Sequence, residues 1–292
     1  MNTLLEVNHL EKSYDGTTIL HDLSFKIQKG EIVGLIGKNG SGKTTLMKAI
    51  LGLITVDSGE IYYQKKGNYT EEKEIMNEIG YLLDCELFEY MNAYDNLFIQ
   101  EKYKNSEKNK DEITKLIIES LDFVGLENNK KKVKGYSFGM KQRLGLALAL
   151  MGTPKLLILD EPFVGLDPVG VEKFKQFIYE LNQNKNVTVL ISSHQLSEIE
   201  QMCDRYLFIS DKNVVEVNPQ FKNQVTIVIS KETAVLKTNL INNVELEGKT
   251  IKFSYDIILI NQILSLIYEN GLSIESIQIG DNYIEKLFRE GL

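Results

Sequence analysis

The sequence predicts an α/β protein built on a buried parallel sheet, followed by a smaller α+β unit. Two almost continuous apolar runs, at 155–161 and 187–194, each end in polar residues. This pattern is typical of strands that are buried on both faces of a parallel sheet. Helices are expected after the two runs, at 169–182 and 195–203. Ligands bind such sheets where the carboxyl ends of the strands lead into loops, so the polar residues that follow the runs indicate a functional site.

The residues before the first run are expected to form strands and then helices. A helix is expected at 44–53, and a mostly helical region covers about 85–150. Within that region one helix begins at Asp111, a suitable N-cap residue, and ends near Gly125. The strands are short and separated by turns, and we expect them at 4–14, 17–27, 31–37, 60–63 and 79–83.

The end of the chain has a different pattern. The stretch 211–220 contains one of the four prolines and is interpreted as a linker. Beyond it, strands are expected at 224–230, 250–255 and 273–280, and helices at 256–271 and 281–290. We therefore expect two domains, at 1–217 and 218–292, which agrees with the size expected of a 292-residue chain.

The overall composition excludes several classes of protein. The net charge of −8 argues against a broad nucleic-acid-binding surface. The two cysteines, Cys85 and Cys203, lie far apart, which argues against a disulfide framework or a zinc site. No segment reaches the roughly 20 apolar residues that span a bilayer, and 257–268 is better interpreted as a packed helix. The N-terminus lacks a signal pattern, so a cytoplasmic location is expected.

A glycine-rich loop follows the strand expected at 31–37. Gly37, Gly42, Lys43 and Thr44 match the pattern G-x-x-x-x-G-K-[ST], and a helix is expected directly after them. Glycines let several backbone N–H groups approach phosphate oxygens, and the positive end of the helix dipole faces the same anion. Lys43 is expected to reach the β- and γ-phosphates, and the Thr44 hydroxyl to hold Mg²⁺. This pattern indicates a P-loop NTPase, which could be a kinase, a GTPase or a motor.

Acidic residues and a histidine follow the two apolar runs. Asp160 is placed to contact Mg²⁺, and Glu161 to polarise an attacking water as a general base. An adjacent acidic pair is usually a solvated turn, but this one ends a buried strand, where charge is costly without a partner. A single histidine is usually structural, but His194 ends the second run at the ligand-binding edge. His9 and His21 are interpreted as structural.

At this point the sequence resembles the ATP-binding subunits of ABC transporters, over residues 2–217 and with the motifs in the family's order. The motifs are an aromatic residue at Tyr14, Walker A at 37–45, the signature YSFGMKQR at 136–143, Walker B at Asp160 and Glu161, the D-loop GLDP at 165–168, and the switch histidine at His194. The resemblance implies an N-terminal antiparallel β part, a RecA-like parallel core and a helical subdomain.

The resemblance also implies how ATP and Mg²⁺ would be bound. Two ATPase domains pair head to tail, and each ATP lies between Walker A of one and the signature of the other. Ser137 and the Gly139 backbone would then donate to the γ-phosphate across the interface. Catalytic roles fall on Glu161, His194 and Lys43. The implied nucleotide-binding residues are Tyr14, Gly37, Asn39, Gly40, Ser41, Gly42, Lys43, Thr44, Thr45, Ser137, Gly139 and Asp167.

Two motifs depart from the family pattern. In the signature, usually LSGGQ, Phe138 replaces the first glycine and Met140 the glutamine. Asp84 stands where the family usually has the Q-loop glutamine, and an aspartate only accepts hydrogen bonds. We include Asp84 with Thr44 and Asp160 as candidate metal residues. Alternatively Asp84 is a neutral change, or a shift of one residue makes Glu86 the relevant acid.

These features favour one function over two alternatives. An acidic Q-loop and this signature resemble the bacitracin-resistance and lantibiotic-immunity branch, which implies the ATPase subunit of an exporter of peptide antibiotic or a similar amphiphile. Its partners would be a separate transmembrane permease and a second ATPase chain, and it would lie on the inner face of the membrane. A soluble ABC-type ATPase is the first alternative, although the paired domains and long insertions of such proteins are missing. A binding module with degraded catalysis is the second.

Overall fold

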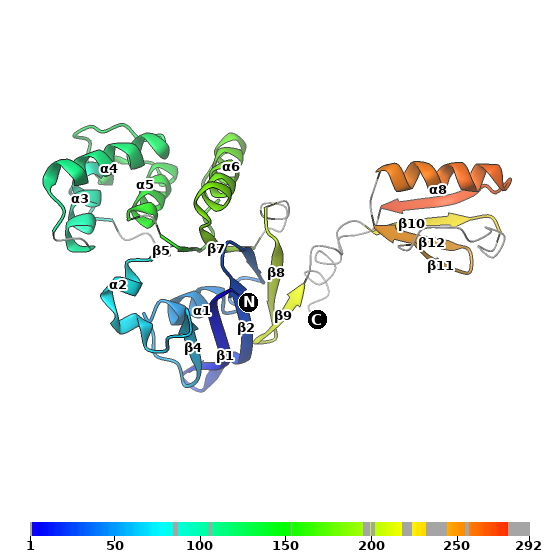
Figure 1. The fold of residues 1–292 in the computed structure, drawn as a ribbon, viewed down its shortest axis with the longest axis horizontal. Helices are drawn as coiled ribbons and strands as arrows, with labels where there is room; N and C mark the ends of the chain where they lie inside the picture. Colours follow the sequence, from blue (N-terminus) through cyan, green and yellow to red (C-terminus); the bar gives the residue numbers. More distant parts are fainter. Residues whose placement is uncertain are drawn as a thin grey trace. The chain divides into compact units, whose positions relative to one another are not determined.

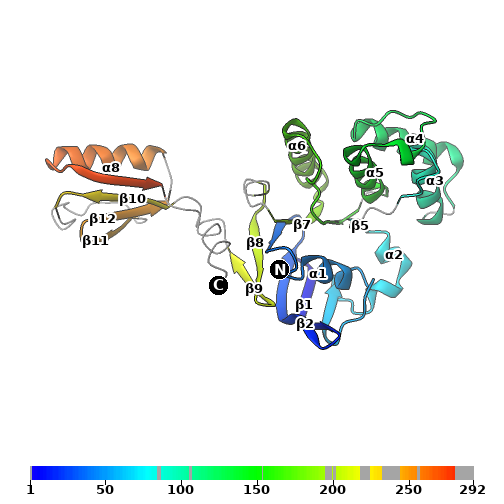
Figure 2. The ribbon, with the colours of Figure 1, turned by 180° about the vertical axis from the view of Figure 1, so that it is seen from behind.

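The computed structural model describes residues 2–83, 87–104, 107–152, 154–194, 199, 202–217, 224–231, 244–254 and 257–279. The chain divides into two compact units, Met1–Val217 and Asn218–Leu292, and each is described by itself (Figures 1 and 2). None of the helices in the described ranges is long and apolar enough to cross a membrane.

The first unit contains a six-stranded sheet in the order β5-β6-β7-β3-β8-β9. The first five strands are parallel, and β9 pairs antiparallel with β8 at the edge. All residues of β6 and β7 are buried, which confirms the parallel sheet expected from the apolar runs. The strands are β5 (Ile79–Leu82), β6 (Leu156–Leu159), β7 (Thr188–Ser193), β3 (Ile32–Ile36), β8 (Arg205–Ser210) and β9 (Asn213–Val217).

The interpretation of 211–220 as a linker is wrong over Asn213–Val217, which is strand β9. The segment contains three valines, a residue type that favours strands. Val217 is only 2% exposed where it pairs with Tyr206 of β8. Pro219 comes after the strand in the sequence and so does not interrupt it. The first unit therefore ends with a sheet edge.

Helix α1 packs between the six-stranded sheet and a three-stranded antiparallel sheet in the order β2-β1-β4. Side chains of both sheets and of α1 form one buried core, in which Leu46, Met47 and Ile50 are fully enclosed. This packing fixes α1 against β3 and so fixes the loop that joins them. The elements are β1 (Thr3–Tyr14), β2 (Thr17–Gln28), β4 (Ser58–Tyr63) and α1 (Lys43–Ile50).

Helices α3, α4 and α5 gather in one region, which Figure 1 shows in green. The N-cap of α4 is Asn109, so the expectation that Asp111 caps this helix is wrong. Asn109 accepts from the Glu112 backbone and the Glu112 side chain accepts from the Asn109 N–H, a reciprocal pair that Asp111 could not make. The remaining elements of the unit are η1 (Tyr69–Glu71), α2 (Lys73–Met76), α3 (Ala93–Lys104), α4 (Lys110–Phe123), η2 (Val133–Gly135), α5 (Phe138–Leu150) and α6 (Pro168–Lys185).

The second unit has a four-stranded antiparallel sheet in the order β11-β12-β10-β13, with α8 packed on it. Its core includes Ile227, Ile251, Ile263 and Ile267, so the stretch 257–268 forms a packed helix as expected. Strand β11 was not expected, because its four residues are too few for a clear alternation. The elements are β10 (Gln224–Ile229), β11 (Val244–Glu247), β12 (Thr250–Ser254), α8 (Ile257–Glu269) and β13 (Ile274–Ile279), and the helix expected at 281–290 lies outside the described residues.

Candidate functional site

The glycine-rich loop joins β3 to α1 with a tightly folded backbone. A methyl group on Gly37 would lie 2.4 Å from Ser41 Oγ and 2.8 Å from the Ile209 carbonyl oxygen. Gly42 adopts φ 105° as the N-cap of α1, and a methyl group there would lie 2.7 Å from Leu20 Cδ2. These two positions therefore require glycine. Buried Ser41 Oγ has no hydrogen-bond partner among the described residues, which leaves a polar atom for a ligand that the loop surrounds.

Lys43 lies at the start of α1 with its ammonium group inside the loop. The side chain is 6% exposed and Nζ donates to the carbonyl oxygens of Gly37, at 2.8 Å, and Lys38, at 3.3 Å. Nζ also lies 3.7 Å from Glu161 Oε1. A buried cation needs such partners, and the same donors can bind phosphate oxygens.

Asp160 follows β6 and forms the centre of a hydroxyl–carboxylate cluster. One carboxylate oxygen accepts from Thr44 Oγ1 at 2.6 Å, and the other from Ser192 Oγ at 2.5 Å. These are hard oxygen ligands of the kind that Mg²⁺ prefers. The described residues contain no group of three or more His, Cys, Asp or Glu side chains that could hold a metal. The Asp160 carboxylate beside the Thr44 hydroxyl fits Mg²⁺, which proteins usually bind through one or two carboxylates together with substrate phosphates.

Glu161 lies next to this cluster and contacts the switch histidine. Its Oε2 is 2.6 Å from His194 Nδ1, and the His194 backbone N–H donates to the same atom at 3.3 Å. The Glu161 N–H donates to Ser192 Oγ at 2.9 Å, and Glu161 has φ 47°, a left-handed conformation that non-glycine residues rarely adopt. The strained backbone turns the carboxylate toward both Lys43 and His194.

The order of the strands brings these residues together. β7 lies between β6 and β3, so His194, Asp160 and the glycine-rich loop follow the carboxyl ends of three neighbouring parallel strands. A cavity of about 410 Å³ lies there. It is lined by Tyr14, Ile19, Asn39, Gly40, Gly42, Lys43, Thr44, Thr45, Asp160 and Glu161.

Tyr14 reaches this cavity from the end of β1, and its ring is 45% exposed, with Lys12 Nζ 5.0 Å from the ring centre. An exposed ring at the mouth of a phosphate-binding cavity can stack on a planar base.

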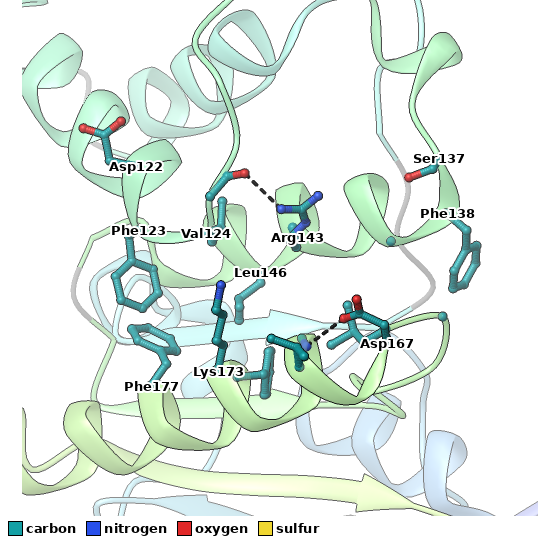
Figure 3. A pocket seen from close by; sticks show the side chains of 17 residues that line it. Asp122, Phe123, Val124, Ser137, Phe138, Arg143, Leu146, Asp167, Lys173 and Phe177 are labelled. Carbon is teal, nitrogen blue, oxygen red and sulfur yellow. Dashed lines mark hydrogen bonds between the residues drawn. The ribbon is translucent and has the colours of Figure 1, made fainter.

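A second cavity, of about 830 Å³, lies between α5, α6 and the C-terminal end of α4, and the signature and the D-loop form part of its lining (Figure 3). Ser137 caps α5 and accepts from the Met140 N–H at 3.3 Å, while Asp167 caps α6 and accepts from the Gly170 N–H at 2.7 Å. Ser137, Gly139 and Asp167 thus share one cavity, and the Walker residues line the other.

One predicted site residue is not among those that the structure describes, and one residue of the site was not predicted. Asp84, and Glu86 as its alternative, lie outside the described residues. Ser192 was not predicted as a site residue, although it bonds to both Asp160 and Glu161. The available signal was its place two residues before His194, at the end of the buried run.

A buried parallel sheet, a glycine-rich phosphate loop and an adjacent carboxylate–histidine pair define a nucleotide-hydrolysing P-loop protein. Comparison with known proteins specifies the family. A family profile described as "ABC transporter" matches residues 20–164. The chain is 40% identical over 222 residues to the bacitracin transport ATP-binding protein BcrA of Bacillus licheniformis, with 75% of this chain and 71% of that protein covered.

A second relative is similar over almost the whole chain. The uncharacterized ABC transporter ATP-binding protein YhcH of Bacillus subtilis (strain 168) is 33% identical over 304 residues, with 98% of this chain and 96% of YhcH covered. A solved structure of the ATP-binding cassette MJ0796, a dimer in a post-hydrolysis state bound to ADP and Pi, has a TM-score of 0.69 and 25% identity, covering 74% of this chain and 99% of that one. The chain belongs to the ATP-binding proteins of the ABC transporter family and is an ATPase of that family.

Proposed function

We propose that this chain supplies the energy for a membrane exporter by pairing head to tail with a second ATPase chain and hydrolysing ATP between them. The observation that carries the proposal is the Glu161 carboxylate, which lies within 3.7 Å of Lys43 Nζ and 2.6 Å of His194 Nδ1 beside the phosphate loop. A carboxylate held in this way can take a proton from a water molecule aligned with the γ-phosphate.

Each residue of the site has a separate role in this proposal. Lys43 and the loop amides bind the phosphates, Tyr14 stacks on adenine, and His194 orients Glu161 and contacts the γ-phosphate. Mg²⁺, when bound by Thr44 and Asp160, would neutralise charge that develops on the phosphate oxygens. Asp84 is proposed to adjust this metal site.

The separation of the two cavities supports a paired arrangement. The Walker residues line one cavity, and Ser137, Gly139 and Asp167 line the other. The chain carries one copy of each motif, so a second chain would complete each ATP site. A second copy of this chain is the simplest such partner.

The other partner would be a separate transmembrane permease, and the chain would lie against the inner face of the cell membrane. The cargo class is proposed from the similarity to a bacitracin transport ATP-binding protein. A peptide antibiotic or a comparable amphiphile is the expected cargo. The C-terminal unit is proposed as a separate accessory domain, from residue 218 onward.

The hydrolysis part is tested by ATPase assays of the purified chain. Lys43→Ala is expected to lower ATP affinity and kcat, because the main cation beside the phosphates is lost. Chelation of Mg²⁺ with EDTA is expected to abolish hydrolysis, and added Mg²⁺ to restore it. The control is Lys185→Ala, which removes a lysine from the last turn of α6. Equal rates for Lys43→Ala and wild type would refute the assignment.

The transport part is tested by affinity purification of the chain from detergent-solubilised native membranes, with partners identified by mass spectrometry. A stoichiometric protein with several membrane spans is the expected partner. Copurification with ribosomes or nucleic acid, or without any partner, would favour the soluble ATPase alternative and refute the exporter proposal.

A further inference from the structure

The side chain of Phe138, on the signature helix α5, contacts the D-loop. A methyl group on Gly165 would lie 2.2 Å from Phe138 Cδ1 and 2.7 Å from Cε1, so the ring lies directly against the glycine backbone. Gly139 makes a second close approach, because a methyl group there would lie 3.0 Å from the Gly165 carbonyl oxygen. The contact therefore depends on an aromatic ring at 138 and on a missing side chain at 165.

This contact closes one end of the 830 Å³ cavity between α5 and α6 (Figure 3). At the other end Phe123 and Phe177 meet, with ring centres 3.5 Å apart. Between the two ends the cavity is lined by Arg143 and Leu146 of α5 and by Lys173 of α6. Phe138 is 58% exposed, so burial in the core does not explain its position.

The D-loop is connected in turn to Glu161. The Val164 N–H donates to the Glu161 carbonyl oxygen at 3.2 Å, and the Leu166 N–H donates to the Phe163 carbonyl oxygen at 3.0 Å. These bonds make 161–166 one compact turn. A shift of Gly165 would therefore move the backbone of Glu161, which already has a strained φ of 47°.

We propose that Phe138 is a positioning residue that couples the signature to Glu161 through Gly165. The proposal rests on the proposed function, in which Ser137 binds the ATP of one site while Glu161 acts at the other. Phe138 then links the two ATP sites to which a single chain contributes. The glycine that is usual at this position in the family has no side chain that could reach Gly165.

An activity cycle with Phe138→Ala, Gly165→Ala and the double variant tests the coupling. Phe138→Ala is expected to lower kcat about tenfold through misplacement of Glu161. Binding of a fluorescent ATP analogue is expected to stay within about twofold of wild type, because the phosphate loop lies in the other cavity. Phe138→Leu keeps a branched side chain against Gly165 and is expected to retain most of kcat.

The double variant separates the contact from local strain. Gly165 has φ 76°, so alanine there is strained in both the single and the double variant, and this contribution cancels in the comparison. The double variant is expected to be more active than Gly165→Ala alone, because the added methyl group no longer meets the ring. If the kcat of the double variant, relative to wild type, equals the product of the relative kcat values of the two single variants, the two changes act independently and the proposal is overturned. A parallel loss of kcat, nucleotide affinity and thermal stability in Phe138→Ala would overturn it too, since it would indicate a purely structural role.

Amide hydrogen exchange tests the contact without any need for hydrolysis. The Val164 and Leu166 amides are expected to exchange about tenfold faster in Phe138→Ala, as local opening becomes easier. The control is Tyr179→Ala on α6, because Tyr179 is 57% exposed and so matches Phe138 in exposure. Unchanged exchange in Phe138→Ala would overturn the proposal. If the wild-type chain does not hydrolyse ATP but exchange is still faster in Phe138→Ala, the proposed function is refuted and the contact between Phe138 and the D-loop is not.

Discussion

Glu161→Gln is expected to slow hydrolysis while tightening ATP binding. The Glu161 carboxylate lies 3.7 Å from Lys43 Nζ, and the two side chains are 23% and 6% exposed. At an effective dielectric constant of about 20, their attraction is about 4 kcal/mol. The cost of removing both charges from water offsets most of this attraction. We therefore expect the free energy of ATP binding to become more favourable by about 1 kcal/mol, or about fivefold in Kd, because Glu161 no longer competes with phosphate for Lys43.

The same substitution removes the proposed base. The amide oxygen that replaces the carboxylate can still accept from His194, so the local geometry is preserved. It cannot take a proton from water, so kcat is expected to fall by about 10² to 10⁴. Because bound ATP then persists, the variant is expected to accumulate as a dimer.

Three measurements check this prediction: phosphate release, titration with a fluorescent ATP analogue, and the oligomeric state with and without ATP. The control is Glu180→Gln, which neutralises an exposed carboxylate on α6 that contacts Gln176. Full activity would refute the role of Glu161 as the base. Weaker ATP binding would refute the competition between Glu161 and phosphate for Lys43, and a monomer in the presence of ATP would refute the ATP-dependent dimer.

The remaining predictions concern the metal residues, the loop backbone and the C-terminal core. Asp160→Asn is expected to raise the Mg²⁺ concentration that half-activates hydrolysis, and an unchanged Mg²⁺ titration would contradict its role. Gly37→Ala is expected to abolish ATP binding in a folded protein, because the methyl group would lie 2.8 Å from the Ile209 carbonyl oxygen. Ile251→Ala, at a position 1% exposed, is expected to destabilise the C-terminal unit by about 2–5 kcal/mol without changing ATP affinity, as calorimetry and nucleotide titration would show.

Local patterns made much of the first unit predictable. The β6 and β7 strands were found because a strand buried on both faces needs a continuous apolar run. The α4 helix was found with the wrong cap, although Asn109 and Glu112 have the spacing of a capping box. Strand β9 was misinterpreted because the nearby proline indicated a linker, whereas its pairing with β8 depends on residues that the local pattern does not include.

By itself the sequence determined the phosphate loop, the acidic pair and the signature, because each depends on a few consecutive residues whose backbone geometry is local. Tertiary structure decided how these segments meet. Packing of β7 between β6 and β3 brings Ser192 and His194 to Asp160 and Glu161. The contact between Phe138 and Gly165 likewise joins segments 27 residues apart, at a distance that only the packing of α5 against the D-loop determines. Pairing between strands and contacts between helices depend on interactions over long sequence separations, so no short pattern specifies them.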